Sequence, residues 1–319
     1  MTLAPATRLV REYSRDYGML VVLVVLLAVL SLLDPTTLAP VNIKNLARQV
    51  SITAMFAAGE TLVILGRMID LSVGSVLGLS AVISAGVLAR TNNAAAAIVA
   101  GLAVGAIMGA LNGVLVAYAR LAAFVVTLAT LAIAGGLTLL YTGARPIAVE
   151  NSAYLFLGQG DVAGVPMPII ISIVLYASLW FLLSRTTFGR YNYAIGGNEE
   201  AARLAGVPVE RYKLTIFVVA GLIAGLSGMV LTARLGSGVP TLGTGYELTA
   251  ITAVVLGGTS LFGGEGKIWG TIVGAAILAL IGNGLNLLNV EAFYQSIVTG
   301  VVVIIAISLD RLLQAYRGR

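Results

Sequence analysis

The sequence predicts an all-α integral membrane protein with about ten transmembrane helices, some of them broken or re-entrant, and with both termini in the cytoplasm. Two observations lead to this fold class. The chain is 59% hydrophobic and 10% charged, with a mean hydropathy of +1.00, whereas a soluble domain is about half apolar and about a quarter charged. Apolar stretches of roughly bilayer-spanning length also recur along the whole chain.

Ten apolar stretches are the candidate spans, since a spanning helix needs roughly 20 apolar residues. They are residues 17–33, 49–66, 71–89, 91–119, 121–144, 162–184, 214–233, 248–264, 268–290 and 292–309. The first is long for a signal peptide, and no clean cleavage pattern follows it. We therefore predict a single transmembrane domain at 17–313, with short cytoplasmic segments at 1–16 and 314–319.

The basic residues set the orientation. Cytoplasmic loops of membrane proteins carry an excess of Lys and Arg, and cytoplasmic termini place fourteen of the 19 basic residues on the inner side. The remaining five are Lys44, Arg48, Arg90, Arg145 and Arg234. On this map the longest inner loop is 185–213 and the longest outer loop is 143–167.

Several functional classes are excluded or disfavoured. The chain has no Cys and no His, which removes disulfides, zinc sites and imidazole catalysis, so no metal site is expected. Its basic residues are scattered, which argues against nucleic acid. The segment "LFGGEGKI" at 261–268 lacks the first glycine and the hydroxyl residue of a phosphate-binding loop. We therefore expect neither an enzyme nor a nucleotide-binding subunit.

Glycines at a spacing of four form one face of the predicted helix at 91–119. They are Gly101, Gly105, Gly109 and Gly113. Such a face lets a neighbouring backbone approach closely, which drives helix association in lipid. The neighbour is a helix of the same subunit, a second subunit or a pore wall.

Three acids, Glu60, Asp70 and Glu247, lie within or beside apolar stretches, where ionisable groups usually face protein or water. The segment "IDLSVGS" at 69–75 suits a break between two helices. Asp70 there either caps the next helix or lines a pathway together with Ser72.

The segment 243–266 is dense in glycine, which weakens a regular helix and predicts a broken or re-entrant element. Tyr246 and Glu247 stand at its start and join the candidate pathway. Three uncharged amides, Asn112, Asn283 and Asn286, either touch a hydroxylated solute or bridge two helices.

A short charged helix is predicted inside the inner loop. Asn198 is a good N-cap, and Glu199 and Glu200 favour the positive end of the helix dipole. The helix continues through Ala201, Arg203, Leu204 and Ala205, and Gly206 ends it before the stop signal of Pro208. So short a helix is marginal in water, so it rests either on a cytoplasmic partner or on its own membrane domain.

The segment "AIGGNEEAARLAGV" resembles the cytoplasmic coupling loop of bacterial ABC-importer permeases of the ribose/xylose/arabinose type. The resemblance continues through "TLVIL…IDLSVGS", "FVVTLATL", "LLYTGARPI", "TLGTGYELTAITAVVLGGTSLFGGEGKIWGTIVGA" and "NGLNLL". It covers about residues 40–310, in the order of the family.

The resemblance implies a permease in the bacterial inner membrane, paired with a second copy or a close homologue. The pair would sit on two cytoplasmic ABC ATPase domains, which would hold ATP and Mg²⁺, and would receive a monosaccharide or polyol from a periplasmic binding protein. The helix around Glu199–Ala205 would then be the coupling helix. This chain itself would hold no cofactor.

The sequence departs from the family at Arg67–Met68, where small residues are usual, at Gly135–Gly136, where an arginine is common, and at Glu265, where a base is frequent. Two other functions remain open. One is an ion-coupled secondary transporter in which Glu60, Asp70 or Glu247 carries the ion, and the other is a structural or receptor subunit.

Overall fold

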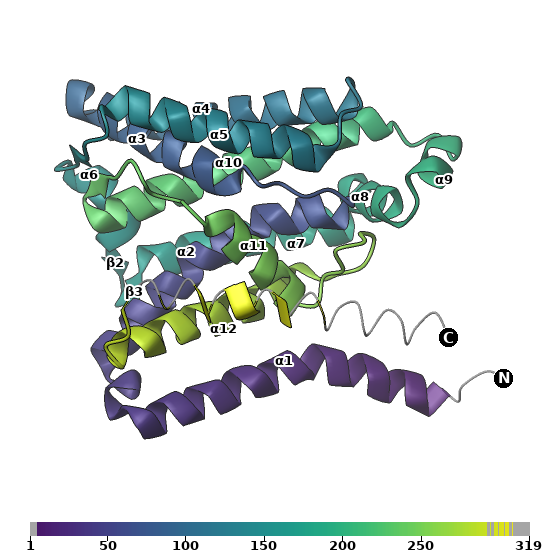
Figure 1. The fold of residues 1–319 in the computed structure, drawn as a ribbon, viewed down its shortest axis with the longest axis horizontal. Helices are drawn as coiled ribbons and strands as arrows, with labels where there is room; N and C mark the ends of the chain where they lie inside the picture. The colour runs from purple at the N-terminus through teal and green to yellow at the C-terminus, as the bar shows by residue number, and fades with distance from the viewer. Residues whose placement is uncertain are drawn as a thin grey trace.

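The computed structural model describes residues 5–291 and then 294, 297, 298, 300–302, 304, 305 and 308, with side chains from Gly18 onward. Its regular structure is almost entirely helical (Figure 1). The helices are α1 (Pro5–Leu33), η1 (Pro35–Leu38), α2 (Pro40–Leu65), α3 (Val73–Thr91), α4 (Ala94–Ala117), α5 (Ala123–Thr142), α6 (Ser152–Gln159), α7 (Met167–Arg185), α8 (Thr187–Gly197), α9 (Glu199–Leu204), α10 (Val209–Leu235), α11 (Tyr246–Leu256) and α12 (Ile268–Leu287).

Six helices within the described residues are long and apolar enough to cross a membrane, namely α3, α4, α5, α7, α10 and α12. The apolar part of α1, Gly18–Leu33, is shorter, and the 26-residue α2 carries Lys44, Arg48 and Glu60. An all-α membrane protein is therefore confirmed. The last expected span, 292–309, lies largely outside the described residues.

The chain is not helical between α2 and α3, where the sequence predicted a break. α2 ends at Leu65, and α3 begins at Val73 with Ser72 as its N-cap. In Figure 1 the connecting segment runs from the α8 end of the molecule toward its middle. Consequently α3 starts part-way along the bundle.

A second break lies between α10 and α11. α11 has 11 residues and rises about 16 Å, about half of the hydrocarbon thickness. After it, Gly258, Gly263 and Gly264 all have positive φ, and no helix continues. The continuous span expected at 248–264 is therefore wrong, whereas the broken element expected from its glycines is confirmed.

The second break touches the first two turns of α3, which directly follow the first break. A Cβ added to Gly74 would clash with the carbonyl oxygen of Gly243, and one added to Gly78 would clash with that of Leu242. Gly243 also has φ +88°, a conformation that glycine adopts without steric cost. The second break and the start of α3 therefore meet through backbone atoms, at what we call the junction of the breaks.

The glycine face of α4 lies against α10 of the same chain. A Cβ on Gly105 would meet the carbonyl oxygen of Gly221, and one on Gly109 would meet that of Phe217. Gly113 lies against Leu214 and Gly101 against Met229. Of the three neighbours considered from the sequence, the structure has the first, a helix of the same subunit.

The expected outer loop, 143–167, folds over the ends of the helices. It contains β1 (Ile147–Ala148), which pairs with β4 (Ser237–Gly238), and the hairpin of β2 (Asp161–Val162) and β3 (Val165–Pro166). The buried Tyr154 hydroxyl on α6 lies 2.9 Å from Ser84 Oγ on α3. This contact ties α6 to the bundle.

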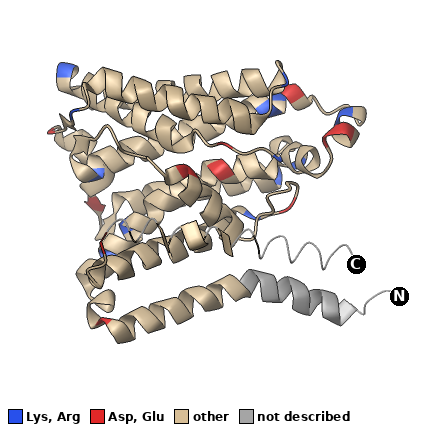
Figure 2. Ribbon diagram, in the orientation of Figure 1, with Lys and Arg blue, Asp and Glu red and all other residues tan. Residues whose placement is uncertain are grey.

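The opposite end carries α8 and α9, and α1 begins there too (Figure 1). The stretch expected as an inner loop, 185–213, is thus largely helical. Figure 2 shows the basic residues mainly at the two ends of the molecule and some acidic residues near its middle. The region between the ends is lined outside by exposed apolar side chains such as Val125 and Leu140, as a lipid-facing surface requires.

Candidate functional site

The short charged helix predicted from the sequence is α9. Asn198 has extended backbone, and its Oδ1 accepts a hydrogen bond from the Ala201 backbone N–H at 2.9 Å. This bond satisfies one of the free donors of the first turn. Gly206 follows the helix with φ +84°. α9 therefore starts and stops as expected, with Ala205 as its C-cap.

One side of α9 packs on its own chain and the other side is open. Ala202 is buried in a small apolar cluster with Ile195 and Val207. Ala201 and Ala205 are exposed, and Leu204 is 82% exposed. The helix thus rests on the membrane domain through Ala202 and still presents an apolar side chain outward.

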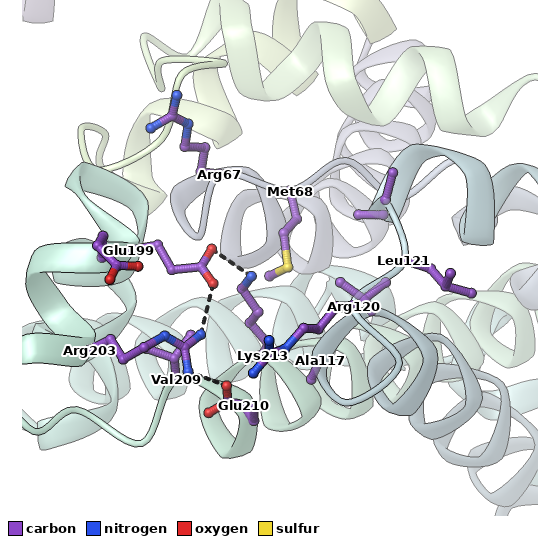
Figure 3. Close-up of a pocket in the computed structure, with 14 residues that line it drawn as sticks. Arg67, Met68, Ala117, Arg120, Leu121, Glu199, Arg203, Val209, Glu210 and Lys213 are labelled. Carbon is purple, nitrogen blue, oxygen red and sulfur yellow. Dashed lines mark hydrogen bonds and ion pairs between the residues drawn. The ribbon is translucent and has the colours of Figure 1, made fainter.

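Charged side chains join α9 to the start of α10, as Figure 3 shows. Glu199 accepts a hydrogen bond from Lys213 Nζ at 2.6 Å and one from Arg203 Nη2 at 3.2 Å. Arg203 also pairs with Glu210, and this hydrogen bond raises the pKa of Arg203. Glu199 and Arg203 are partly exposed, so solvent screening leaves each pair only a small contribution to stability.

A pocket of about 550 Å³ separates α9 from the turn between α4 and α5 (Figure 3). Its lining residues are Arg67, Met68, Val116, Ala117, Arg120, Leu121, Ala122, Ala123, Glu199, Glu200, Arg203, Val209, Glu210 and Lys213. The pocket combines an apolar wall from the α4–α5 turn with the charged side chains of α9 and α10.

Two arginines at this pocket adopt a backbone conformation that favours glycine. Arg67, just after α2, has φ +61°, and Arg120, just after α4, has φ +56°. Each is disfavoured there because of its Cβ. This explains why the turn before "IDLSVG" suits a small residue, and it makes Arg67 a strained departure.

Deeper in the bundle, buried hydrogen bonds hold the first break. Asp70 Oδ1 accepts from the Ser72 backbone N–H at 2.7 Å and from Ser72 Oγ at 2.5 Å. Asn112 Nδ2 donates to Ser72 Oγ at 2.9 Å, and Thr130 Oγ1 donates to Asn112 Oδ1 at 2.6 Å. Asp70 braces the turn here, and Ser72 takes the N-cap position that was considered for Asp70. Asn112 connects α4 to both α3 and α5.

Glu60 lies beside this network. It is buried, and its Oε1 accepts a hydrogen bond from the Asp70 backbone N–H at 3.2 Å. Its Oε2 is buried and has no hydrogen-bond partner among the described residues. A buried carboxyl oxygen without a hydrogen-bond partner is costly, so Glu60 is an energetically unfavourable feature of this network.

The other candidate pathway residues lie in two further places. Tyr246 stacks on Phe56 with ring centroids 5.0 Å apart. Glu247 is partly exposed, and its Oε2 lies 2.6 Å from where a Cβ on Gly74 would stand. These two residues therefore flank the junction of the breaks.

Asn283 is not at that junction. It exchanges hydrogen bonds with Asn42 of α2 at 3.0 and 2.9 Å and so bridges two helices. Asn286, one turn further along α12, is exposed.

Several residues of the site escaped sequence reasoning. Thr127 accepts from the Leu71 backbone N–H at 3.1 Å and so braces the first break, and Thr130 contacts Asn112. Their spacing of three places them on one helix face, which is the only signal the sequence offers. Asn192 on α8 is fully buried, and no pattern marked it. Among the described residues, no cluster of three or more acidic side chains is arranged to hold a metal ion.

Comparison with known proteins gives concordant matches. The family model described as "Branched-chain amino acid transport system / permease component" matches residues 42–307. The ribose import permease protein RbsC of Bacillus subtilis (strain 168) is 47% identical over 291 residues, which cover 91% of this chain and 90% of that protein. No solved structure matches the chain.

Two Escherichia coli (strain K12) proteins are also similar. The D-allose transport system permease protein AlsC is 40% identical over 299 residues, covering 93% of this chain and 92% of that protein. The L-arabinose transport system permease protein AraH is 40% identical over 296 residues, covering 93% and 90%.

Proposed function

This chain belongs to the family of branched-chain amino acid transport system permease components, and we propose that it forms the translocation pathway for a monosaccharide or a related polyol. It is a transmembrane permease subunit of an ABC importer in the inner membrane. It is a transport subunit and not an enzyme, because ATP hydrolysis belongs to a separate ATPase component.

One observation supports the sugar assignment. Three relatives named for ribose, allose and arabinose each match more than nine-tenths of this chain. Sugars are rich in hydroxyl groups, which amide, carboxylate and tyrosine side chains can bind by hydrogen bonds. Tyr246 and Glu247, which flank the junction of the two breaks, offer two of these kinds of group.

For the pathway, the proposal is that the solute passes along this junction. Discontinuous helices with non-helical backbone at mid-depth are typical of transporter binding sites. Tyr246 and Glu247 flank the junction, and Asp70 and Ser72 form the turn that precedes α3. Asn112 would act through Ser72, by positioning it.

For coupling, α9 is the proposed contact with the ATPase. It is capped at both ends, held to α8 by Ala202 and open on the side of Leu204. Its ion pairs with Lys213 and Glu210 are partly exposed, so a docking partner can rearrange them. The importer would also include a periplasmic binding protein and a second permease copy or homologue.

The proposed topology keeps ten crossings with both termini in the cytoplasm. The non-helical segment 239–245 and α11 together make one of these crossings. It begins at the outer end, where β4 pairs with β1 of the outer loop. It finishes at the inner end, where the Gly264 backbone N–H bonds to the last residue of α2. A metal or nucleotide site within this chain forms no part of the proposal.

Reconstituted uptake tests this function. The permease, its ATPase and its binding protein would be placed in liposomes and offered labelled ribose, allose and L-arabinose in turn. We expect ATP-dependent uptake of a monosaccharide, with no dependence on a proton or sodium gradient. Uptake that proceeds without ATP and collapses with an ion gradient would instead support the ion-coupled alternative, for which the buried Glu60–Asp70 pair is the favouring observation.

A further inference from the structure

α8 lies between α9 and the membrane-embedded elements and is bonded to two of them. Asn192 Nδ2 donates to the Leu62 carbonyl oxygen of α2 at 3.0 Å. The Tyr193 hydroxyl donates to the Gly266 carbonyl oxygen, in the loop between α11 and α12, at 2.9 Å. α8 is thus joined both to the end of α2 and to that loop.

The same two elements are joined to each other beside α8. The Gly264 backbone N–H donates to the Leu65 carbonyl oxygen at 2.9 Å. Gly196 of α8 packs directly on this bond: a Cβ there would stand 2.5 Å from the Gly264 nitrogen and would clash with the Leu65 oxygen. Three backbones therefore approach one another closely at a single point.

These contacts involve two carbonyl groups in the last turn of α2. The last carbonyl groups of an α-helix lack a partner within the helix, and that of Leu65 is bonded by the 257–267 loop. The Leu62 carbonyl accepts from the Gly66 backbone N–H at 3.2 Å and takes its second hydrogen bond from α8. Asn192 is fully buried and Gly196 is buried. Buried hydrogen bonds and close backbone packing make these contacts difficult to separate.

The two elements bonded to α8 are connected along the chain to the two breaks, the first directly and the second through α11. The end of α2 leads directly into the non-helical segment 66–72, and the 257–267 loop directly follows α11. A displacement of α8 therefore reaches the first break directly and the second break through α11.

The other side of α9 is held differently. Its links to α10 are partly exposed ion pairs and the apolar cluster that Ala202 shares with Val209, and the pocket of about 550 Å³ separates it from the α4–α5 turn. A partner can break exposed pairs at little cost, and the pocket leaves room for movement. α9 is therefore tightly fixed on one side and loosely fixed on the other.

From this asymmetry we propose that α8, α9, the last turn of α2 and the 257–267 loop move as one rigid body against the α4–α5 turn. Asn192, Tyr193 and Gly196 are the positioning residues that hold this body together. The body transmits the displacement of α9 to both breaks at once. The inference rests on the proposed coupling role of α9 and identifies where the motion is delivered.

Matched variants on α8 test this proposal in the reconstituted importer. Gly196→Ala introduces the clash described above, whereas Gly197→Ala does not, because nothing lies within 4 Å of a Cβ at Gly197. Tyr193→Phe removes one hydrogen bond, and Tyr191→Phe is its control on the same helix. The measurements are ATPase co-purification and the number of sugar molecules transported per ATP hydrolysed.

We expect Gly196→Ala and Tyr193→Phe to keep the ATPase bound but to lower transport per ATP, by about tenfold and about fivefold, with both controls at the wild-type value. Wild-type coupling in Tyr193→Phe would overturn the proposal, as would parallel loss of ATPase binding and transport. If Gly196→Ala fails to fold, the comparison of Tyr193→Phe with Tyr191→Phe tests the proposal by itself. A wild-type preparation without bound ATPase would contradict the coupling role of α9 itself, which is a separate outcome.

Cross-linking gives a second test, because the chain contains no cysteine. A short bifunctional maleimide would join Gly197→Cys to Glu265→Cys within the proposed rigid body, or Glu200→Cys to Leu121→Cys across the pocket. We expect the first cross-link to leave transport intact and the second to arrest it. Arrest by the first, or normal transport with the second, would contradict movement as one body.

Discussion

Asn112 joins three helices through one side chain. Its amide nitrogen donates to Ser72 at the start of α3, and its amide oxygen accepts from Thr130 of α5. A primary amide suits this position because it carries a donor and an acceptor that point in different directions. Since lipid removes the hydrophobic drive between helices, such bonds help to fix helix positions.

Replacing Thr130 tests this bridge. Thr130→Val leaves the buried Asn112 oxygen without its donor, so we expect a loss of about 1–3 kcal/mol of stability. Thr138→Val is the matched control, because Thr138 is buried on the same helix but donates only to the Ala134 carbonyl of its own helix. Thermal unfolding in detergent measures both variants. An equal fall in Tm for the two would show that Asn112 does not depend on Thr130.

Reversing the charge of Glu199 tests α9 at the level of one side chain. Glu199→Arg loses the bonds to Lys213 and Arg203 and places a third cation beside them. We expect folding stability to change by less than about 1 kcal/mol, because these pairs are partly exposed, while ATPase co-purification falls by about tenfold or more. Arg145→Glu, a reversal at the opposite end, should keep the ATPase bound. Undiminished co-purification in Glu199→Arg would argue against docking at this residue.

Sequence reasoning identified polar residues at depth but not their partners. Asp70 and Ser72 were selected together from one segment and Asn112 separately, and the structure brings the three together. Asn283 gave the same signal, yet it pairs with Asn42 on another helix. The cost of burial is a property of one residue, whereas the partner depends on helix packing, which a single sequence does not specify.

At the level of elements, a short helix could be predicted from the sequence only where local start and stop signals mark its ends. α9 was predicted with nearly correct bounds because Asn198 and Gly206 give strong start and stop signals. α8 was missed although Thr186 caps it through its side chain. Its three glycines at 189, 196 and 197 lower helix propensity, and Gly196 is needed for the close approach to α2. Here tertiary packing outweighs propensity.

The packing of α4 on α10 permits a matched test with glycines. Gly109→Ala places a Cβ against the backbone of Phe217, so we expect a loss of about 1–3 kcal/mol. Gly136→Ala on α5 has nothing within 4 Å of the new Cβ and should be neutral, or stabilising by up to about 1 kcal/mol. Thermal unfolding in detergent compares the two. Equal stability of both variants would mean that α4 and α10 do not pack through this face.

At the scale of the whole molecule, burial is distributed unevenly. α3 and α10 are mostly buried, whereas α4, α5 and α7 leave most of their surface exposed. In a membrane protein such surfaces face lipid or a second subunit. The breaks at 66–72 and 239–245 lie among the well-buried helices, and α8 and the pocket lie at one end. The fold thus separates a well-buried interior from an end that carries the charged helix α9 and the pocket.

The orientation of that end can be measured with single cysteines, since the natural chain has none. Gly197→Cys on α8 and Ala163→Cys in the β2–β3 hairpin are exposed positions at opposite ends. In right-side-out vesicles a membrane-impermeant maleimide should label Ala163→Cys and spare Gly197→Cys. Inside-out vesicles should give the reverse. The reason is that basic residues favour the cytoplasmic side, which places the α8 end there. Thr2→Cys should label together with Gly197→Cys if the chain crosses the membrane once between the N-terminus and Pro40 and once through α2. Labelling of Thr2→Cys from the same side as Ala163→Cys would mean that α1 does not cross the membrane. The predicted number of ten crossings would then be wrong.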